Sequence, residues 1–246
     1  MYTTMLNHGN LTITDCGVTG TIEYYNPRHP GVTVYNRAGT FSLWNGTISG
    51  NDSGAGLFNG ENCNMYGGRI RNNTTSDTYS SGGVINGGTF NMYGGSITGN
   101  ITGADGGGVL NTEGGTFNMY GGSILNNSAD NNDGGGVKNS SGRFNMYGGT
   151  ISGNTAYRFG GGVYNGSIFN MSGGTISGNT ARLGGGGVNN GRTFTMSGGT
   201  ISDNKVTNTS AYGAGVNNDS KFTMTGGSIT GNIATGSLNA RGGGIN

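Results

Sequence analysis

Two aspartates occupy the same position in successive copies of a glycine-rich motif. Asp105 and Asp133 each stand directly before a Gly-Gly-Gly triplet, and Arg158 lies one residue from that position in the next copy. If the copies stack as neighbouring strands, the two backbones lie about 4.8 Å apart. Paired carboxylates with a basic partner could cleave polysaccharides, and together with Asp130 and Asn132 they could bind Ca²⁺. The alternative is a solvated turn, where Asp is common. We favour the turn and expect no catalytic residue, no cofactor and at most a weak metal site.

A column of aromatic residues is the second feature with chemical potential. Five consecutive copies carry an aromatic residue at one outward position: Trp44, Tyr66, Tyr93, Tyr120 and Tyr147. Later copies carry Ser172, Ser197 and Thr225 there. Rings in register could offer stacking faces to sugars or an apolar patch to another protein. Tyrosine also suits strands and stacks on itself for purely structural reasons, so both interpretations stay open.

A third pattern consists of paired hydroxyl residues that flank a repeated isoleucine. Strands facing water through such pairs could bind ice, and the pairs are Thr47/Ser49, Ser96/Thr98, Thr150/Ser152, Thr175/Ser177, Thr200/Ser202 and Ser228/Thr230. Arg69 and Arg71 interrupt one copy and Leu125 another. Strand propensity and hydroxyl pairing explain the pattern as well, so ice binding is the lesser alternative.

Composition excludes several classes of protein. The 246 residues include 57 Gly and 2 Pro, only 9% are charged, and the net charge is +1. This balance lacks the basic patches of nucleic-acid-binding proteins, and no apolar run is long enough for a membrane-spanning helix. The first residues also lack the features of a signal peptide. Cys16 and Cys63 are predicted to lie about 9.6 Å apart along the stack, so we expect free, mostly buried thiols.

The elements that position these residues come from an internal repeat. A motif of the form Phe-Asn-Met-Tyr-Gly-Gly-Thr-Ile-Ser-Gly-Asn, seen at 144–154, recurs with steps of 25 to 28 residues between the Met positions from Met65 to Met224. A second motif, GGGVxN, alternates with it. Apolar and polar residues alternate within short runs that glycines separate, which indicates strands and not helices. We therefore predict one all-β domain over 1–246: a right-handed parallel β-helix of about nine coils, each of about 25–27 residues with three short strands.

Stacked coils place equivalent residues in ladders along the axis. The predicted core has four apolar ladders, formed by the Phe, Met, Ile and Val positions of the repeat, and the third of these begins at Val18. Glycines are expected at corners, where positive φ and close approach exclude a Cβ. A structural amide ladder is predicted at the Gly-Asn corners, with the members Asn51, Asn73, Asn100, Asn127, Asn154, Asn179, Asn204 and Asn232.

The motif Ile151–Ala156 followed by Gly160-Gly161-Gly162-Val163 resembles the paired FxxN and GGAI motifs of polymorphic outer-membrane autotransporter passengers. More broadly, residues 5 to 246 are similar to the glycine-rich right-handed β-helix repeats of adhesin-like surface proteins. The chain has Ile where the first family has Phe. The resemblance implies a β-helix fold and a surface-exposed role, whereas β-helices as a class serve many functions.

These observations predict a non-enzymatic extracellular or cell-surface solenoid: a stalk, an adhesin or a fibre subunit. Carbohydrate binding or polysaccharide degradation through the tyrosines and loop carboxylates is the alternative. Neither end carries a polar capping segment, so we expect head-to-tail stacking with a second copy or continuation into further repeats of a longer chain. Surface glycans or host proteins are candidate partners. Nucleic acid and membrane insertion are not expected.

Overall fold

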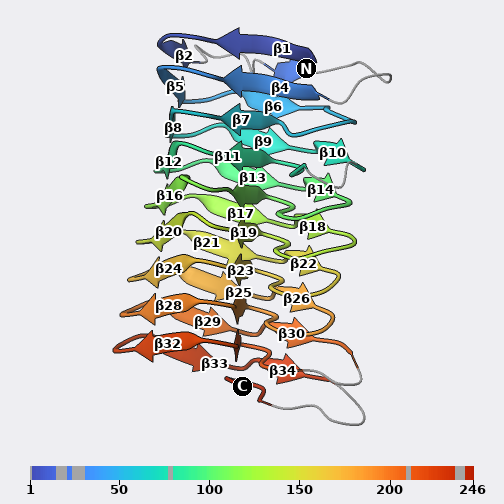
Figure 1. Cartoon of the computed structure of the whole chain (residues 1–246), viewed down its shortest axis with the longest axis vertical. Helices are drawn as coiled ribbons and strands as arrows, with labels where there is room; N and C mark the ends of the chain where they lie inside the picture. The colour runs from blue at the N-terminus through green and yellow to red at the C-terminus, as the bar shows by residue number, and fades with distance from the viewer. Residues whose placement is uncertain (1, 15–20, 24–30, 77–79, 209–211, 236–241) are drawn as a thin grey trace.

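Strands that recur along the sequence stack in parallel on their counterparts in the next copy of the repeat. The computed structural model describes residues 2–14, 21–23, 31–76, 80–208, 212–235 and 242–246. Figure 1 shows the coils stacked along the long axis of the molecule, from the N-terminal coil to the C-terminal one. The predicted all-β parallel solenoid is confirmed. Within the described residues, no helix is long and apolar enough to cross a membrane.

Three nine-stranded parallel sheets form the body of the solenoid, and they match the three strands predicted for each coil. Sheet A consists of β1 (Tyr2–Asn7), β4 (Gly31–Asn36), β7 (Leu57–Asn59), β11 (Val84–Asn86), β15 (Val109–Asn111), β19 (Val137–Asn139), β23 (Val163–Asn165), β27 (Val188–Asn190) and β31 (Val216–Asn218). Sheet B consists of β2 (Leu11–Ile13), β5 (Thr40–Leu43), β8 (Asn62–Met65), β12 (Thr89–Met92), β16 (Thr116–Met119), β20 (Arg143–Met146), β24 (Ile168–Met171), β28 (Thr193–Met196) and β32 (Lys221–Met224). Sheet C consists of β3 (Thr21–Glu23), β6 (Thr47–Ser49), β9 (Arg69–Arg71), β13 (Ser96–Thr98), β17 (Ser123–Leu125), β21 (Thr150–Ser152), β25 (Thr175–Ser177), β29 (Thr200–Ser202) and β33 (Ser228–Thr230).

A fourth sheet, which the sequence analysis did not predict, lies in the segment after the Gly-Asn corner. Sheet D has seven two-residue strands: β10 (Thr74–Thr75), β14 (Ile101–Thr102), β18 (Ser128–Ala129), β22 (Thr155–Ala156), β26 (Thr180–Ala181), β30 (Lys205–Val206) and β34 (Ile233–Ala234). The second residue of each strand is small or β-branched and faces inward, as Ala129 and Ala181 do with no exposed surface. The first two residues of this segment pair in register in seven coils.

The core consists of the four predicted apolar ladders. Phe117, Met119, Ile124 and Val137 are completely buried, and each pairs with the residue of the same type in the next coil along the chain. The Phe rings stack with centroids 4.6–5.2 Å apart from Phe90 to Phe222. Repetition of one side chain at one position therefore fixes the register, because a slip would place different shapes against each other.

The first coil departs from the prediction. The backbone of Ile22, and not Val18, pairs with Ile48 in the isoleucine ladder. Val18 and Cys16 lie outside the described residues. Seven residues separate β2 from β3, whereas three separate β16 from β17, so the later spacing points to Val18, the earlier of two β-branched residues.

Glycine pairs make the corner between sheets B and C possible. Gly122 has φ +78°, a conformation that L side chains rarely adopt. A Cβ on Gly121 would stand 2.6 Å from the carbonyl oxygen of Tyr93 in the preceding coil. The corner thus combines a left-handed turn with backbone contact between coils, and it presents the preceding aromatic residue to solvent.

Candidate functional site

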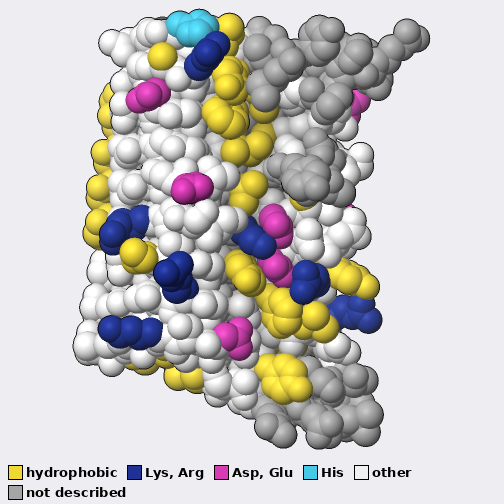
Figure 2. Space-filling model, in the orientation of Figure 1, with side chains coloured by type: hydrophobic (Ala, Val, Ile, Leu, Met, Phe, Trp, Pro, Cys, Tyr) yellow, Lys and Arg dark blue, Asp and Glu magenta, His cyan; other side chains and the backbone are white. Residues whose placement is uncertain are grey.

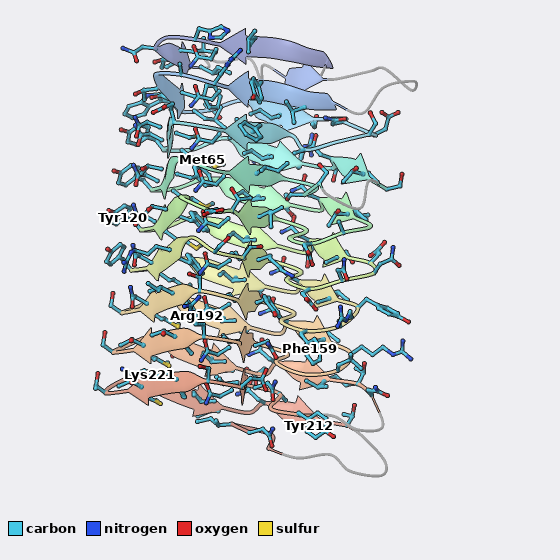
Figure 3. All side chains as sticks on the ribbon, viewed as in Figure 1. Met65, Tyr120, Phe159, Arg192, Tyr212 and Lys221 are labelled. Carbon is cyan, nitrogen blue, oxygen red and sulfur yellow. The ribbon has the colours of Figure 1, made fainter. Side chains whose placement is uncertain are left out.

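The predicted aromatic ladder is formed in the structure. Each of its residues directly follows a sheet B strand, and its backbone N–H donates to the preceding coil, as Tyr120 N does to Met92 O at 2.8 Å. The five side chains are 38–52% exposed. Tyr120, labelled in Figure 3, lies at the outer edge of sheet B, where the ladder projects away from the core.

Within the ladder the rings cover one another's faces. Centroid separations are 4.1 Å for Trp44–Tyr66 and 4.8–5.0 Å for the three following tyrosine pairs, with interplanar angles of 7–18°. A sugar ring binds an aromatic residue through the face of the ring. The three inner rings therefore offer only edges and hydroxyls. Among the described residues, the outer faces of Trp44 and Tyr147 are the ones without a stacked aromatic neighbour.

The ladder also changes the acidity of Tyr120. Partial burial raises the pKa of Tyr120 above its ordinary value, and repulsion from Tyr147 and Tyr93 adds to this effect. Tyr120 consequently keeps its proton to a higher pH than an isolated phenol does.

An asparagine ladder, which the sequence analysis did not single out, runs beside the aromatic one. Its members lie two residues before the aromatic position, so they share the outer face of sheet B. Asn118 Nδ2 donates to Asn91 Oδ1 at 2.9 Å, and Asn145 Nδ2 donates to Asn118 Oδ1 at 2.8 Å. The same contact joins Asn91 to Asn64 and Asn170 to Asn145. The asparagine of the repeated Phe-Asn-Met-Tyr motif could have predicted this ladder from the sequence.

The predicted corner ladder of asparagines is confirmed as a buried structural element. From Asn73 to Asn204, each Nδ2 donates to the Oδ1 of the next coil at 2.9–3.0 Å. At Asn51 the backbone N–H makes this contact alone, at 3.2 Å. A second buried ladder, also missed, joins Asn7, Asn36, Asn59, Asn86, Asn111, Asn139, Asn165, Asn190 and Asn218 at 2.7–2.9 Å.

The predicted hydroxyl pairs line the outer face of sheet C in register. Thr150 pairs with Thr175 and then Thr200, and Ser152 pairs with Ser177 and Ser202. Arg69 and Arg71 are exposed in β9 and interrupt the array between β6 and β13. The uninterrupted array therefore covers four coils at the C-terminal end.

The two loop aspartates meet, but a lysine lies between them. Lys138 Nζ is 3.0 Å from Asp105 Oδ1 and 3.1 Å from Asp133 Oδ2. Asp130 instead accepts a hydrogen bond from the Ser128 hydroxyl. An ammonium group thus occupies the position that a cation would need. Among the described residues, no three His, Cys, Asp or Glu side chains converge as a metal site.

The described free cysteine is confirmed as buried. Cys63 replaces Phe in the aromatic core ladder, between Phe41 and Phe90, and is 1% exposed. Burial raises the pKa of its thiol far above the ordinary value. Cys63 therefore packs as a small apolar residue.

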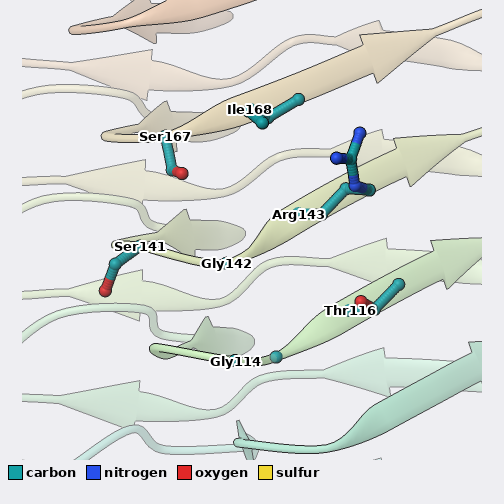
Figure 4. Close-up of a pocket in the computed structure, with 8 residues that line it drawn as sticks. Gly114, Thr116, Ser141, Gly142, Arg143, Ser167 and Ile168 are labelled. Atoms are coloured by element: carbon teal, nitrogen blue, oxygen red, sulfur yellow. The ribbon is translucent and has the colours of Figure 1, made fainter.

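A shallow depression of about 220 Å³ lies where sheet A turns into sheet B (Figure 4). Its lining comes from three consecutive coils and includes Thr116, Ser141, Arg143 and Ile168. Its volume is below the range of about 300–1,000 Å³ that is typical of small-molecule sites. Arg143 is the only charged residue in its lining.

Comparison of the chain with protein-family models, with curated proteins and with solved structures finds no match. The ladders, the charged cluster and the exposed faces are the features from which a function can be inferred.

Proposed function

We propose that this chain is a non-enzymatic β-solenoid that acts outside the cell as a stalk, a surface adhesin or a fibre subunit. The observation that carries the proposal is the continuity of the stack: the four apolar ladders and two buried amide ladders run through nearly every coil. The resemblance to glycine-rich repeats of adhesin-like proteins supports the same role. A solenoid built this way is extended and repetitive, which suits a spacer or a display surface.

Coils of the same kind, from a second copy or from further repeats, are the proposed partner along the axis. Met196 is fully buried beneath the following coil, whereas its counterpart Met224 is 41% exposed. A further coil would cover Met224 and continue the Phe ladder beyond Phe222, since identical residues would stack on each other.

Two measurements test this function. Labelling of intact producing cells with an antibody against the chain is expected to give surface signal, and a signal seen only after lysis would contradict it. Light scattering and negative-stain microscopy of the purified chain test self-stacking. Rods that lengthen with concentration are expected, and a monomer that persists at high concentration would contradict stacking between copies.

The second candidate is glycan binding at the aromatic ladder. It is favoured by the juxtaposition of exposed ring edges and hydroxyls with the parallel row of amides at Asn91, Asn118 and Asn145. Phenol and amide groups together can hydrogen-bond to a polysaccharide that lies along the axis.

A glycan array tests this candidate. Wild type is compared with the double variant Tyr93→Ala/Tyr120→Ala and with Ser172→Ala/Ser197→Ala, which alters the same column in later coils. Loss of signal in the tyrosine variant alone is expected. A wild-type profile that the tyrosine variant retains would leave the ladder with a structural role only.

A further inference from the structure

Lys138 stands in a column that is otherwise apolar through its neighbouring coils. It occupies the outward position of sheet A between Leu110 and Tyr164, and Figure 2 shows a band of hydrophobic side chains down this face. Its ammonium group lies 4.3 Å from the centre of the Tyr164 ring. The side chains of Lys138 and Asp133 are only 13% and 9% exposed, and that of Asp105 is 30% exposed. Partly burying such charges costs free energy that an ion pair repays incompletely.

Contacts around the two carboxylates are unequal. Asp105 Oδ1 accepts both from Lys138 Nζ and from the backbone N–H of Asp133, at 3.0 and 3.1 Å. Asp105 Oδ2 has no hydrogen-bond partner among the described residues. Asp133 Oδ1 accepts from the backbone N–H of Phe159 at 3.2 Å, while its Oδ2 is 3.1 Å from Lys138 Nζ.

These positions match the requirements of amide formation. The amine of Lys138 lies 3.0 Å from one oxygen of the Asp105 carboxyl group, so its nitrogen is held beside the carbon that it would attack. A backbone N–H is placed to stabilise negative charge on the carboxyl oxygen that stays, as in an oxyanion hole. A second carboxylate lies within proton-transfer distance of the amine.

We propose that Lys138 and Asp105 form an intramolecular isopeptide bond, with Asp133 as the proton carrier. The Nζ–Cγ bond forms and the Cγ–Oδ2 bond of Asp105 breaks. Two of the three ammonium protons leave with Oδ2 as water, and the third stays on the amide nitrogen. Asp133 accepts each proton from Nζ, delivers it to the departing oxygen and ends as a carboxylate.

The overall reaction needs no oxidant or cofactor. One ammonium and one carboxylate become a neutral amide and water, so the net charge is unchanged. The product removes two partly buried charges from an apolar face. Because Asp105 precedes β15 and Lys138 lies in β19, the bond joins two neighbouring coils covalently. The proposal does not depend on where the protein acts.

Mass spectrometry of the purified, folded chain tests the bond. Wild type is expected to weigh one water molecule less than its sequence requires. A digest with trypsin and a protease that cleaves after Glu113, which lies between the two residues, should contain one branched peptide that includes both Asp105 and Lys138, with no cleavage after Lys138. Lys138→Arg, which keeps a cation beside both carboxylates but lacks the nucleophile, is the matched control and should have the full mass.

Two further variants separate the roles of the carboxylates. Asp133→Asn should slow the reaction by about 10²-fold or more, because the proton carrier is lost. Asp105→Asn should lose ammonia in place of water and reach the wild-type product mass.

Both aspartates precede glycine, so a cyclic imide at either one would also lose water. An imide would persist in Lys138→Arg, would leave the two peptides separate and would reopen in mild base. Full mass in the folded wild type, or a water loss that Lys138→Arg retains, would overturn the proposal.

Discussion

Asn100 and Asn127, in neighbouring coils, share one oxygen atom between two donors. The side-chain Nδ2 and the backbone N–H of Asn100 both lie 3.0 Å from Asn127 Oδ1. The second proton of Asn100 Nδ2 is donated to Ile70 O at 3.0 Å. Asn100 Oδ1 in turn accepts from the backbone N–H and the Nδ2 of Asn73. Every polar atom of the Asn100 side chain thus has a partner inside the protein, which is the condition for burying it.

Removing one amide from the buried corner ladder is expected to cost far more than removing one from the half-buried ladder on the outer face of sheet B. Asn127→Ala leaves two donors of Asn100 without their acceptor and removes one donor from the carbonyl of Ile97. The expected loss in the free energy of unfolding is about 3 kcal/mol or more. Asn118→Ala, in the half-buried ladder on the outer face of sheet B, should cost about 1 kcal/mol or less. Denaturant unfolding of both variants checks this, and equal costs would contradict it.

Gly122 is expected to tolerate no side chain. Gly122→Ala forces alanine into a left-handed conformation and places Cβ 2.7 Å from Met92 Cε and 2.8 Å from Gly95 O. Strain of this kind costs about 1–3 kcal/mol. Gly87→Ala is the matched control, because the nearest atom to a Cβ there is 3.5 Å away and φ is not positive. Thermal unfolding should show a clear loss for Gly122→Ala only; similar curves would contradict the strain.

Stability is expected to fall in strong base because of the tyrosine ladder. The folded-state pKa of Tyr120 is raised above 10.0, so the folded chain holds this proton more tightly than the unfolded chain does. The resulting contribution is present below pH 10.0 and is lost as the pH rises through the folded-state pKa.

Denaturant unfolding on either side of this range, with absorbance titration of the phenols, measures the effect. Tyr120→Phe should lose less stability in base than wild type. Tyr212→Phe, outside the ladder, should behave as wild type does. An identical loss in all three proteins would mean that the ladder is not its source.

Cys63 is expected to be inert in the folded protein. Its thiol lies between the Phe41 and Phe90 positions of the core ladder, and burial raises its pKa, so the reactive thiolate is scarce. Alkylation followed by peptide mapping should show no modification of Cys63 under native conditions and full modification in denaturant. Rapid native modification would show that the coil opens readily.

The sequence was sufficient to predict the stack and its register. Phe144, Met146 and Ile151 recur at nearly constant spacing, and a side chain that must lie on its own copy permits one alignment of the coils. The same logic placed the corner asparagines and the exposed tyrosines correctly.

Contacts that depend on how the backbone turns between two sheets could not be predicted from the sequence. The spacing of Asp105 and Asp133 indicated proximity, but only the backbone shows that Lys138, 33 residues after Asp105, reaches both of them. The asparagine of the GGGVxN motif was visible in the sequence. Its burial could not be predicted, because it depends on the turn that follows the motif. In the first coil more residues separate β2 from β3 than in later coils, so Ile22 and not Val18 takes the isoleucine position.

Each coil contacts only the coils directly before and after it, and this gives the molecule a distinctive response to tension. When the two ends of the chain are pulled apart, the coils should unfold one after another. Each coil of about 27 residues would yield roughly 90 Å of extended chain in place of about 4.8 Å of stack. A bond between Lys138 and Asp105 would prevent the chain between these two residues from extending. That segment would stay short at forces that unfold the other coils.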